Sequence, residues 1–204
     1  LITNLNVEAP RLGSKHLSKI LNKRLGGEPI QYALGSWAFR KLDLLVDSRV
    51  LIPRPETELI TQRCVQIYKT DGSSKNLQGL DIGTGSGVLC LSLKLELPQS
   101  NWLATDISID CLKITEKNSR QLNANVKLLQ SHCARGLKGL FDIIVSNPPY
   151  IAMGDPLVQK EVDQYEPHLA LYAEQGGLEL IYEILNSMLK LLSPEGRGFI
   201  EIGY

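Results

Sequence analysis

The segment Gly79-Leu80-Asp81-Ile82-Gly83-Thr84-Gly85-Ser86-Gly87 joins a short apolar run to a glycine-rich stretch. The apolar run predicts a strand over 79–82, and the pattern that follows predicts a helix over 88–97. Glycines here let the backbone turn sharply and approach a ligand, and the start of the following helix offers unpaired N–H groups. The segment therefore predicts a strand–turn–helix unit that binds a nucleotide-like ligand. A tight connection without a ligand is the alternative.

Apolar runs and helical patterns alternate through the rest of the chain after this unit. Further strands are expected near residues 102–106, 126–130, 141–146 and 198–202, and further helices near 109–123 and 178–192. Such alternation predicts right-handed crossovers and a parallel sheet with helices on both faces. We expect an α/β fold with a doubly wound, Rossmann-like sheet whose strands take the spatial order 3-2-1-4-5.

The part of the chain before residue 77 has a different pattern. Apolar residues at helical spacing predict a helix over about 10–25, which Gly26 and Gly27 end. Two alternating runs, 32–39 and 42–46, predict a hairpin. The prolines of the next segment exclude a strand interior there, and Glu56 and Glu58 suit the first turn of a helix that continues to about residue 69. Residues 70–76 are expected to form a surface connection.

Composition and charge exclude several classes of protein. The 204 residues carry 22 Lys+Arg and 22 Asp+Glu, so the zero net charge provides no strong attraction to nucleic acid or anionic membranes. No apolar stretch approaches the roughly 20 residues that span a bilayer. The four cysteines form no CxxC pair and no His cluster accompanies them, so we expect no metal site. We expect a cytoplasmic protein, or an organelle protein whose targeting segment is missing.

Asp106 ends the predicted strand 102–106, 19 residues after Gly87. A carboxylate at this place can accept both ribose hydroxyls of an adenosine. The alternative is that Asp106 caps the following helix, and the two roles are compatible. The chain has no GxxxxGK[ST] segment, so the sequence does not favour an ATPase or a GTPase.

The segment Asn147-Pro148-Pro149-Tyr150 follows the apolar strand 141–146, at the sheet edge where open α/β folds bind ligands. The two prolines hold the backbone extended and remove two N–H donors, which leaves carbonyl acceptors facing the cleft. Asn147 adds a side-chain carbonyl and Tyr150 adds a flat ring. This combination suits a planar NH₂ group whose nitrogen is aimed at an electrophile. A rigid turn without a ligand is the alternative.

The glycine turn, Asp106 and the segment 147–150 resemble those of S-adenosylmethionine-dependent methyltransferases that modify amide or exocyclic amino nitrogens. Residues 27–32 and 52–58, with Gly35 and Phe39, are similar more narrowly to the release-factor glutamine methyltransferases, the HemK-type proteins. This resemblance implies S-adenosylmethionine as cofactor and a class 1 peptide chain release factor as partner. It further implies N5-methylation of the glutamine in the Gly-Gly-Gln motif of that factor. From the zero net charge we expect no direct binding of nucleic acid.

The resemblance also implies roles for individual residues. The cofactor would contact the glycine turn, the ribose acceptor and two residues after later strands: Gly83, Thr84, Gly85, Ser86, Gly87, Asp106, Cys133 and Asn147. Catalysis would rest on Asn147, the carbonyl of Pro148, and Tyr150, which packs against the substrate amide. The substrate would also contact Pro149, Arg54 and Glu56.

Two departures from the family are visible. After the third predicted strand the family usually has an acidic residue near the adenine, often followed by an aromatic, but this chain has Ser131-His132-Cys133. We therefore expect no carboxylate at that place. The family also has further helices before residue 10 and two more strands after the one ending near residue 202. The expected units are 1–28, the remnant of a helical substrate-recognition domain; 29–54, a β-hairpin linker; and 55–204, a C-terminally truncated methyltransferase domain.

Three other functions remain open on the sequence. A ribosomal-protein glutamine methyltransferase shares the acceptor motif but typically lacks the Pro-Glu-Thr-Glu run of residues 55–58. An adenine-N6 methyltransferase of nucleic acids would be expected to carry basic patches or a recognition domain. The chain could also bind a release factor or cofactor without catalysis.

Overall fold

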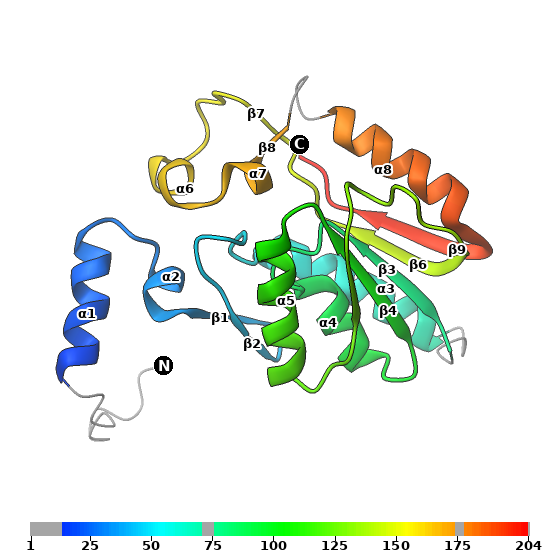
Figure 1. Cartoon of the computed structure of the whole chain (residues 1–204), viewed down its shortest axis with the longest axis horizontal. Helices are drawn as coiled ribbons and strands as arrows, with labels where there is room; N and C mark the ends of the chain where they lie inside the picture. Colours follow the sequence, from blue (N-terminus) through cyan, green and yellow to red (C-terminus); the bar gives the residue numbers. More distant parts are fainter. Residues whose placement is uncertain (1–13, 71–75, 174–177, 204) are drawn as a thin grey trace.

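A parallel five-stranded sheet forms the centre of the computed structural model, which describes residues 14–70, 76–173 and 178–203 (Figure 1). The strands are β3 (Gln78–Ile82), β4 (Asn101–Asp106), β5 (Lys127–Gln130), β6 (Phe141–Ser146) and β9 (Leu192–Ile200). Their spatial order is β5-β4-β3-β6-β9, and each adjacent pair is parallel. This order is the predicted 3-2-1-4-5, so the doubly wound α/β fold is confirmed.

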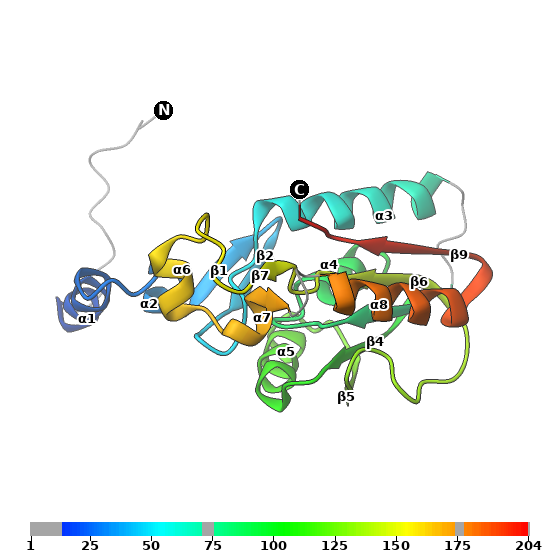
Figure 2. The same cartoon turned by 90° about the horizontal axis from the view of Figure 1, so that it is seen from above.

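Helices cover both faces of the sheet. The helices are α3 (Glu58–Thr70), α4 (Val88–Glu96) and α5 (Ile109–Gln121) on one side and α8 (Leu178–Leu191) on the other (Figure 2). Successive residues of a strand point to opposite faces. In β6, Ile143 and Val145 accordingly join the core under α3 and α4, whereas Ile144 joins the core under α8. Burial on both faces explains why residues 143–145 of β6 form a continuous apolar run.

The N-terminal part consists of α1 (Ser14–Leu25), α2 (Ile30–Leu34) and a hairpin of β1 (Ser36–Phe39) and β2 (Leu42–Leu45). The hairpin is confirmed, but the prediction that its first strand begins at residue 32 is wrong. Residues 30–34 form a helical turn that starts after Pro29 and ends at Gly35, whose φ of 80° only glycine adopts readily. The first four residues of the predicted helix 10–25, and 71–75 of the predicted connection 70–76, lie outside the described residues.

A buried asparagine of α5 fastens this hairpin to the glycine turn. The Asn118 side chain accepts a hydrogen bond from Leu45 N at 2.8 Å and donates to Leu45 O at 3.1 Å. Its Nδ2 also donates to Ser86 O at 2.8 Å. Asn118 is fully buried, so the pairing of its polar atoms fixes β2 against the start of α4.

The segment between β6 and α8 crosses the carboxyl ends of the strands and contains four short elements that sequence analysis did not predict. They are β7 (Ile151–Ala152), α6 (Lys160–Tyr165), α7 (His168–Leu171) and β8 (Tyr172–Ala173) (Figure 1). Glu166, which is 4% exposed, ties this segment to the linker. It accepts hydrogen bonds from Ile52 N at 3.1 Å and Arg54 Nη2 at 2.5 Å. Within the described ranges, no helix has the length and apolar character needed to span a membrane.

The packing of Gly79 against Trp102 yields a test of the sheet register. Gly79 lies opposite Trp102 in β4, and a Cβ at Gly79 would lie 2.5 Å from Trp102 Cδ2. We expect Gly79→Ala to lower the free energy of unfolding by about 1–3 kcal/mol, measured by urea denaturation. Adding Trp102→Leu should recover part of this loss in a double-mutant cycle. Unchanged stability of the alanine variant would contradict the register.

Candidate functional site

The carboxyl ends of β3, β4, β5 and β6 border a cavity of about 720 Å³. Many of the residues predicted from sequence line it: Gly83, Thr84, Gly85, Ser86, Asp106, Cys133, Arg54, Asn147, Pro148 and Pro149. Three predicted site residues, Gly87, Glu56 and Tyr150, are not among the lining residues. The structure thus brings together residues that lie far apart in the chain.

The glycines of the turn have two different tasks. Gly83, Gly85 and Gly87 all have positive φ, of 73°, 56° and 84°. A Cβ at Gly83 or Gly85 would meet no atom within 4 Å, so these two leave open space beside the cavity. A Cβ at Gly87 would lie 2.8 Å from Leu91 Cδ1, so Gly87 is required for packing of the turn on its own helix.

Asp81 holds the glycine turn from within the protein. Its Oδ2 accepts hydrogen bonds from Thr84 Oγ1 at 2.8 Å and Cys90 N at 3.2 Å. The side chain is 1% exposed, and its Oδ1 has no hydrogen-bond partner among the described residues. Burial raises the pKa of this carboxyl to about 6, although its hydrogen bonds oppose the shift. Asp81 is therefore a structural group of the turn.

Asp106 presents its carboxylate to the cavity. Its Oδ2 accepts from Gly85 N and its Oδ1 from Ser108 N, each at 2.9 Å. The N-cap of α5 is Ser108, whose Oγ accepts from Cys111 N, so the alternative that Asp106 caps this helix is wrong. A carboxylate can accept about four hydrogen bonds, so Asp106 retains capacity for the hydroxyl groups of a ligand.

A chain of hydrogen bonds holds Asn147 at the end of β6. Asn147 Nδ2 donates to Thr57 Oγ1 at 3.1 Å, and Thr57 Oγ1 donates to Glu201 Oε2 at 2.7 Å. Tyr150 OH donates to the other oxygen of Glu201 at 3.2 Å. Thr57 lies in η1 (Pro55–Thr57) and is 1% exposed, and Glu201 directly follows β9.

This chain fixes the orientation of the Asn147 amide. A carboxylate without a proton only accepts hydrogen bonds, so the Thr57 hydroxyl uses its hydrogen on Glu201. The Thr57 oxygen can then only accept from Asn147, which must present its NH₂ to Thr57. Asn147 Oδ1 is consequently left able to accept a hydrogen bond, and Asn147 lines the cavity.

The remaining predicted substrate residues differ in their positions. Arg54 lines the cavity and pairs with the buried Glu166. Tyr150 turns toward Glu201, and burial, reinforced by that carboxylate, raises the pKa of its hydroxyl. Glu56 is exposed at the surface. Among these residues, Arg54 is the one that the structure places in the cavity wall.

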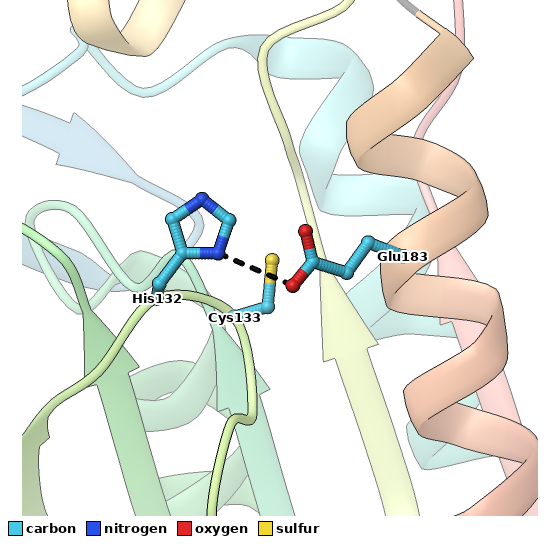
Figure 3. Close-up of side chains that lie close together, drawn as sticks. All are labelled: His132, Cys133 and Glu183. Carbon is cyan, nitrogen blue, oxygen red and sulfur yellow. Dashed lines mark ion pairs between the residues drawn. The ribbon is translucent and has the colours of Figure 1, made fainter.

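The end of the cavity beside β5 contains a carboxylate, contrary to our expectation from Ser131-His132-Cys133. Glu183 of α8 lies next to His132 and Cys133, with 3.3 Å between its Oε1 and His132 Nδ1 (Figure 3). Arg135 Nε donates to the same oxygen at 2.9 Å. Burial raises the pKa of Glu183, but its partners Arg135 and His132 outweigh this and leave the pKa below its usual value. The carboxylate comes from a helix about 50 residues later in the chain, which the sequence comparison of one loop could not reveal.

Sequence analysis assigned no role to several residues that shape this site. Thr57 was noted only as part of a resembling segment, and Glu166, Glu183 and Glu201 were not noted at all. A role for Glu201 could have been predicted, because it is an acidic residue near the end of the predicted strand 198–202, at the edge of the sheet where ligands bind. Glu166 and Glu183 lie in helical or irregular surroundings where a carboxylate is usually solvated, so no role could have been predicted for them.

Comparison with known proteins gives consistent matches. Residues 63–182 match the methyltransferase small domain family. The chain is 40% identical over 193 residues to the release factor glutamine methyltransferase of Lactococcus lactis, covering 93% of this chain and 69% of that protein. It is 35% identical over 224 residues to a bifunctional methyltransferase of Rickettsia typhi, covering all of this chain and 43% of that protein.

A solved structure shares the fold. The N-terminal domain of human METTL16 in complex with SAH superposes with a TM-score of 0.54 at 22% identity. The match covers 80% of this chain and 61% of that chain. At this level of identity the likeness supports the fold only.

The raised pKa of Asp81 yields a prediction for stability. An aspartate that titrates near 3.8 when unfolded and near 6 when folded binds its proton more tightly in the folded state. The contribution of the Asp81 carboxyl to stability is therefore fully present below its pKa in the unfolded state, and it is lost as pH rises through about 6. We expect the stability of the wild type, relative to Asp81→Asn, to fall between about pH 4 and pH 6 in urea denaturation. Parallel pH profiles for the two proteins would contradict this.

Proposed function

The chain belongs to the release factor glutamine methyltransferase family, and from this premise we propose the reaction that it catalyses. It transfers a methyl group from S-adenosylmethionine to the side-chain amide nitrogen, N5, of a glutamine. The substrate is the glutamine in the Gly-Gly-Gln motif of a class 1 peptide chain release factor.

The cavity fits this cofactor in size and in chemistry. Its volume of about 720 Å³ lies within the range of roughly 300–1,000 Å³ that small-molecule sites occupy. Gly83 and Gly85 let a ligand approach the backbone, and Asp106 keeps acceptor capacity for ribose hydroxyls. At the β5 end, the apolar side chains of Leu180 and Ile184 and the carboxylate of Glu183 suit a purine ring and its amino group. The bound cofactor supplies an electrophilic methyl group on a sulfonium.

The proposal rests on the contacts of Asn147, because they leave its Oδ1 available to accept a hydrogen bond from an amide NH₂. Asn147 Oδ1 and the carbonyl of Pro148 accept the two hydrogens of the glutamine amide and so fix its plane. An amide nitrogen is a poor nucleophile because its lone pair is delocalised, so orientation must contribute much of the rate. The same two oxygens stabilise the positive charge that develops on the nitrogen.

The N-terminal part supplies a surface beside the site for a protein substrate. We divide the chain into residues 1–28, the linker 29–54 and the methyltransferase domain 55–204. Arg24 of α1 pairs with Glu161 of α6 at 3.0 Å, and Tyr165 OH donates to Gly26 O at 2.6 Å. These contacts set α1 next to the segment that crosses the cavity. The zero net charge favours a protein substrate over a nucleic acid.

Mass spectrometry of candidate substrates tests the proposed reaction. The chain, incubated with labelled S-adenosylmethionine and a class 1 release factor, should add one methyl group to the glutamine of Gly-Gly-Gln. Asn147→Ala should lower turnover by about 10²–10³ and change cofactor affinity by no more than a few-fold, because one preorganised polar group is removed. Labelling of a ribosomal protein or of DNA, with none on the release factor, would overturn the assignment.

The bond between Thr57 and Asn147 yields a second prediction. Thr57→Val keeps the shape but removes the hydroxyl, so the Asn147 amide loses the partner that orients it. We expect kcat to fall by up to about 10²-fold, because a small displacement of the Asn147 amide misplaces the substrate. The cofactor affinity should change little. Thr57→Ser, which keeps the hydroxyl, is the matched control and should stay close to the wild type. Equal turnover of the two variants, both folded by circular dichroism, would remove Thr57 from this role.

A further inference from the structure

Three side chains with metal-ligating atoms meet at the β5 end of the cavity. His132 and Cys133 follow β5, and Glu183 reaches them from α8 (Figure 3). Their ligand atoms all lie within 4.8 Å of one another. All three residues line the cavity, so a ligand bound among them would share its space.

The nitrogen of His132 that faces this group has no hydrogen-bond partner among the described residues. His132 Nδ1 is buried, and Glu183 Oε1 lies 3.3 Å from it without completing a hydrogen bond of good geometry. A buried polar atom without a partner costs free energy. An ion placed between the nitrogen and the carboxylate would remove this cost.

The donor set and its spacing match the preferences of zinc. Imidazole nitrogen, thiolate sulfur and carboxylate oxygen are the usual protein ligands of Zn²⁺, at bond lengths of about 2.0–2.3 Å. Tetrahedral coordination at those lengths separates ligand atoms by about 3.3–3.8 Å. The 3.3 Å between His132 Nδ1 and Glu183 Oε1 already meets this requirement. Cys133 Sγ lies within 4.8 Å of both other ligand atoms, so it needs to move by no more than about 1.3 Å, which rotation about its Cα–Cβ bond can supply.

We propose that His132, Cys133 and Glu183 form a three-ligand Zn²⁺ site whose open fourth position faces the cavity. Because the site occupies the β5 end, bound zinc excludes the nucleoside part of the methyl donor. This second statement rests on the proposed function, whereas the binding of zinc does not.

Arg135 competes with a metal ion for Glu183, so the proposal predicts the direction in which an Arg135 variant changes the affinity for zinc. Its Nε holds the same Glu183 oxygen at 2.9 Å, and 70% of its side chain is exposed. Zinc must displace this contact, and the Cys133 thiol must release its proton to the solvent. Arg135→Gln should therefore tighten zinc binding, because it frees the carboxylate without removing a ligand.

Titration of the whole chain with Co²⁺ and Zn²⁺, without cofactor, tests the site. We expect Co²⁺ to produce a thiolate charge-transfer band together with the visible bands of tetrahedral cobalt, and Zn²⁺ to abolish both. Cys133→Ser should remove the charge-transfer band. Glu183→Gln and His132→Ala should each weaken Zn²⁺ binding at least about tenfold, because even the loss of an outer-shell partner typically costs that much. The matched control is His16→Ala, since His16 is an exposed histidine of α1.

The outcomes separate this proposal from the proposed function. Absence of the thiolate band, or a wild-type affinity in both the Glu183 and the His132 variants, would overturn the site even if the chain methylates release factor. Calorimetry of S-adenosylhomocysteine binding with and without Zn²⁺ tests exclusion, and we expect weaker binding with the metal. Equal affinity with saturating zinc would refute the exclusion. Zinc binding in a chain that binds no cofactor would refute the proposed function and leave the site intact.

Discussion

The parallel direction of the five strands is the constraint on which the site depends. Because right-handed crossovers return the chain to the same side of the sheet, every strand ends at the same edge. Gly83 follows β3, His132 follows β5, Asn147 follows β6 and Glu201 follows β9, while Asp106 is the last residue of β4. No local feature of these segments brings them together. The topology alone brings the ends of β3, β4, β5 and β6 into one cavity wall and places the end of β9 next to β6.

Buried polar groups then fix the parts that the sheet does not hold. Asn118 joins β2 to the glycine turn, and Glu166 joins the linker to the segment after β6. Glu201 joins η1, through Thr57, to the end of β6. Polar groups removed from water bond in few geometries and lose free energy when unpaired, so each of these contacts defines one arrangement. Residues 49–54 thereby form part of the cavity wall.

The sequence predicted the features that a few neighbouring residues determine. Alternating apolar runs located the sheet and its order, and the glycine turn, Asp106 and Asn147 each stood at the end of a predicted strand. The prediction was wrong where an alternating pattern of a few residues conflicted with residues that begin and end a helix. Residues 32–34 alternate like a strand, but Pro29 and Gly35 bound a single helical turn. Glu183 and Glu201 could not receive roles from the sequence, since their importance arises from partners about 50 and 144 residues away.

The two ends of the cavity differ in their chemistry, and this difference follows from what each must hold. At the β6 end, the uncharged residues Asn147 and Pro148 line the cavity, whereas Glu201 does not line it and bonds to Thr57 and Tyr150. A neutral acceptor can orient an uncharged amide without binding a cation in its place. At the β5 end, the carboxylate of Glu183 lies in the cavity wall, beside a thiol and an imidazole nitrogen that has no hydrogen-bond partner in the described part of the chain. That end can accept hydrogen bonds from a purine, but the same atoms also suit a metal ion. Its selectivity therefore depends on Arg135, which already neutralises the carboxylate and makes a second cation there less favourable.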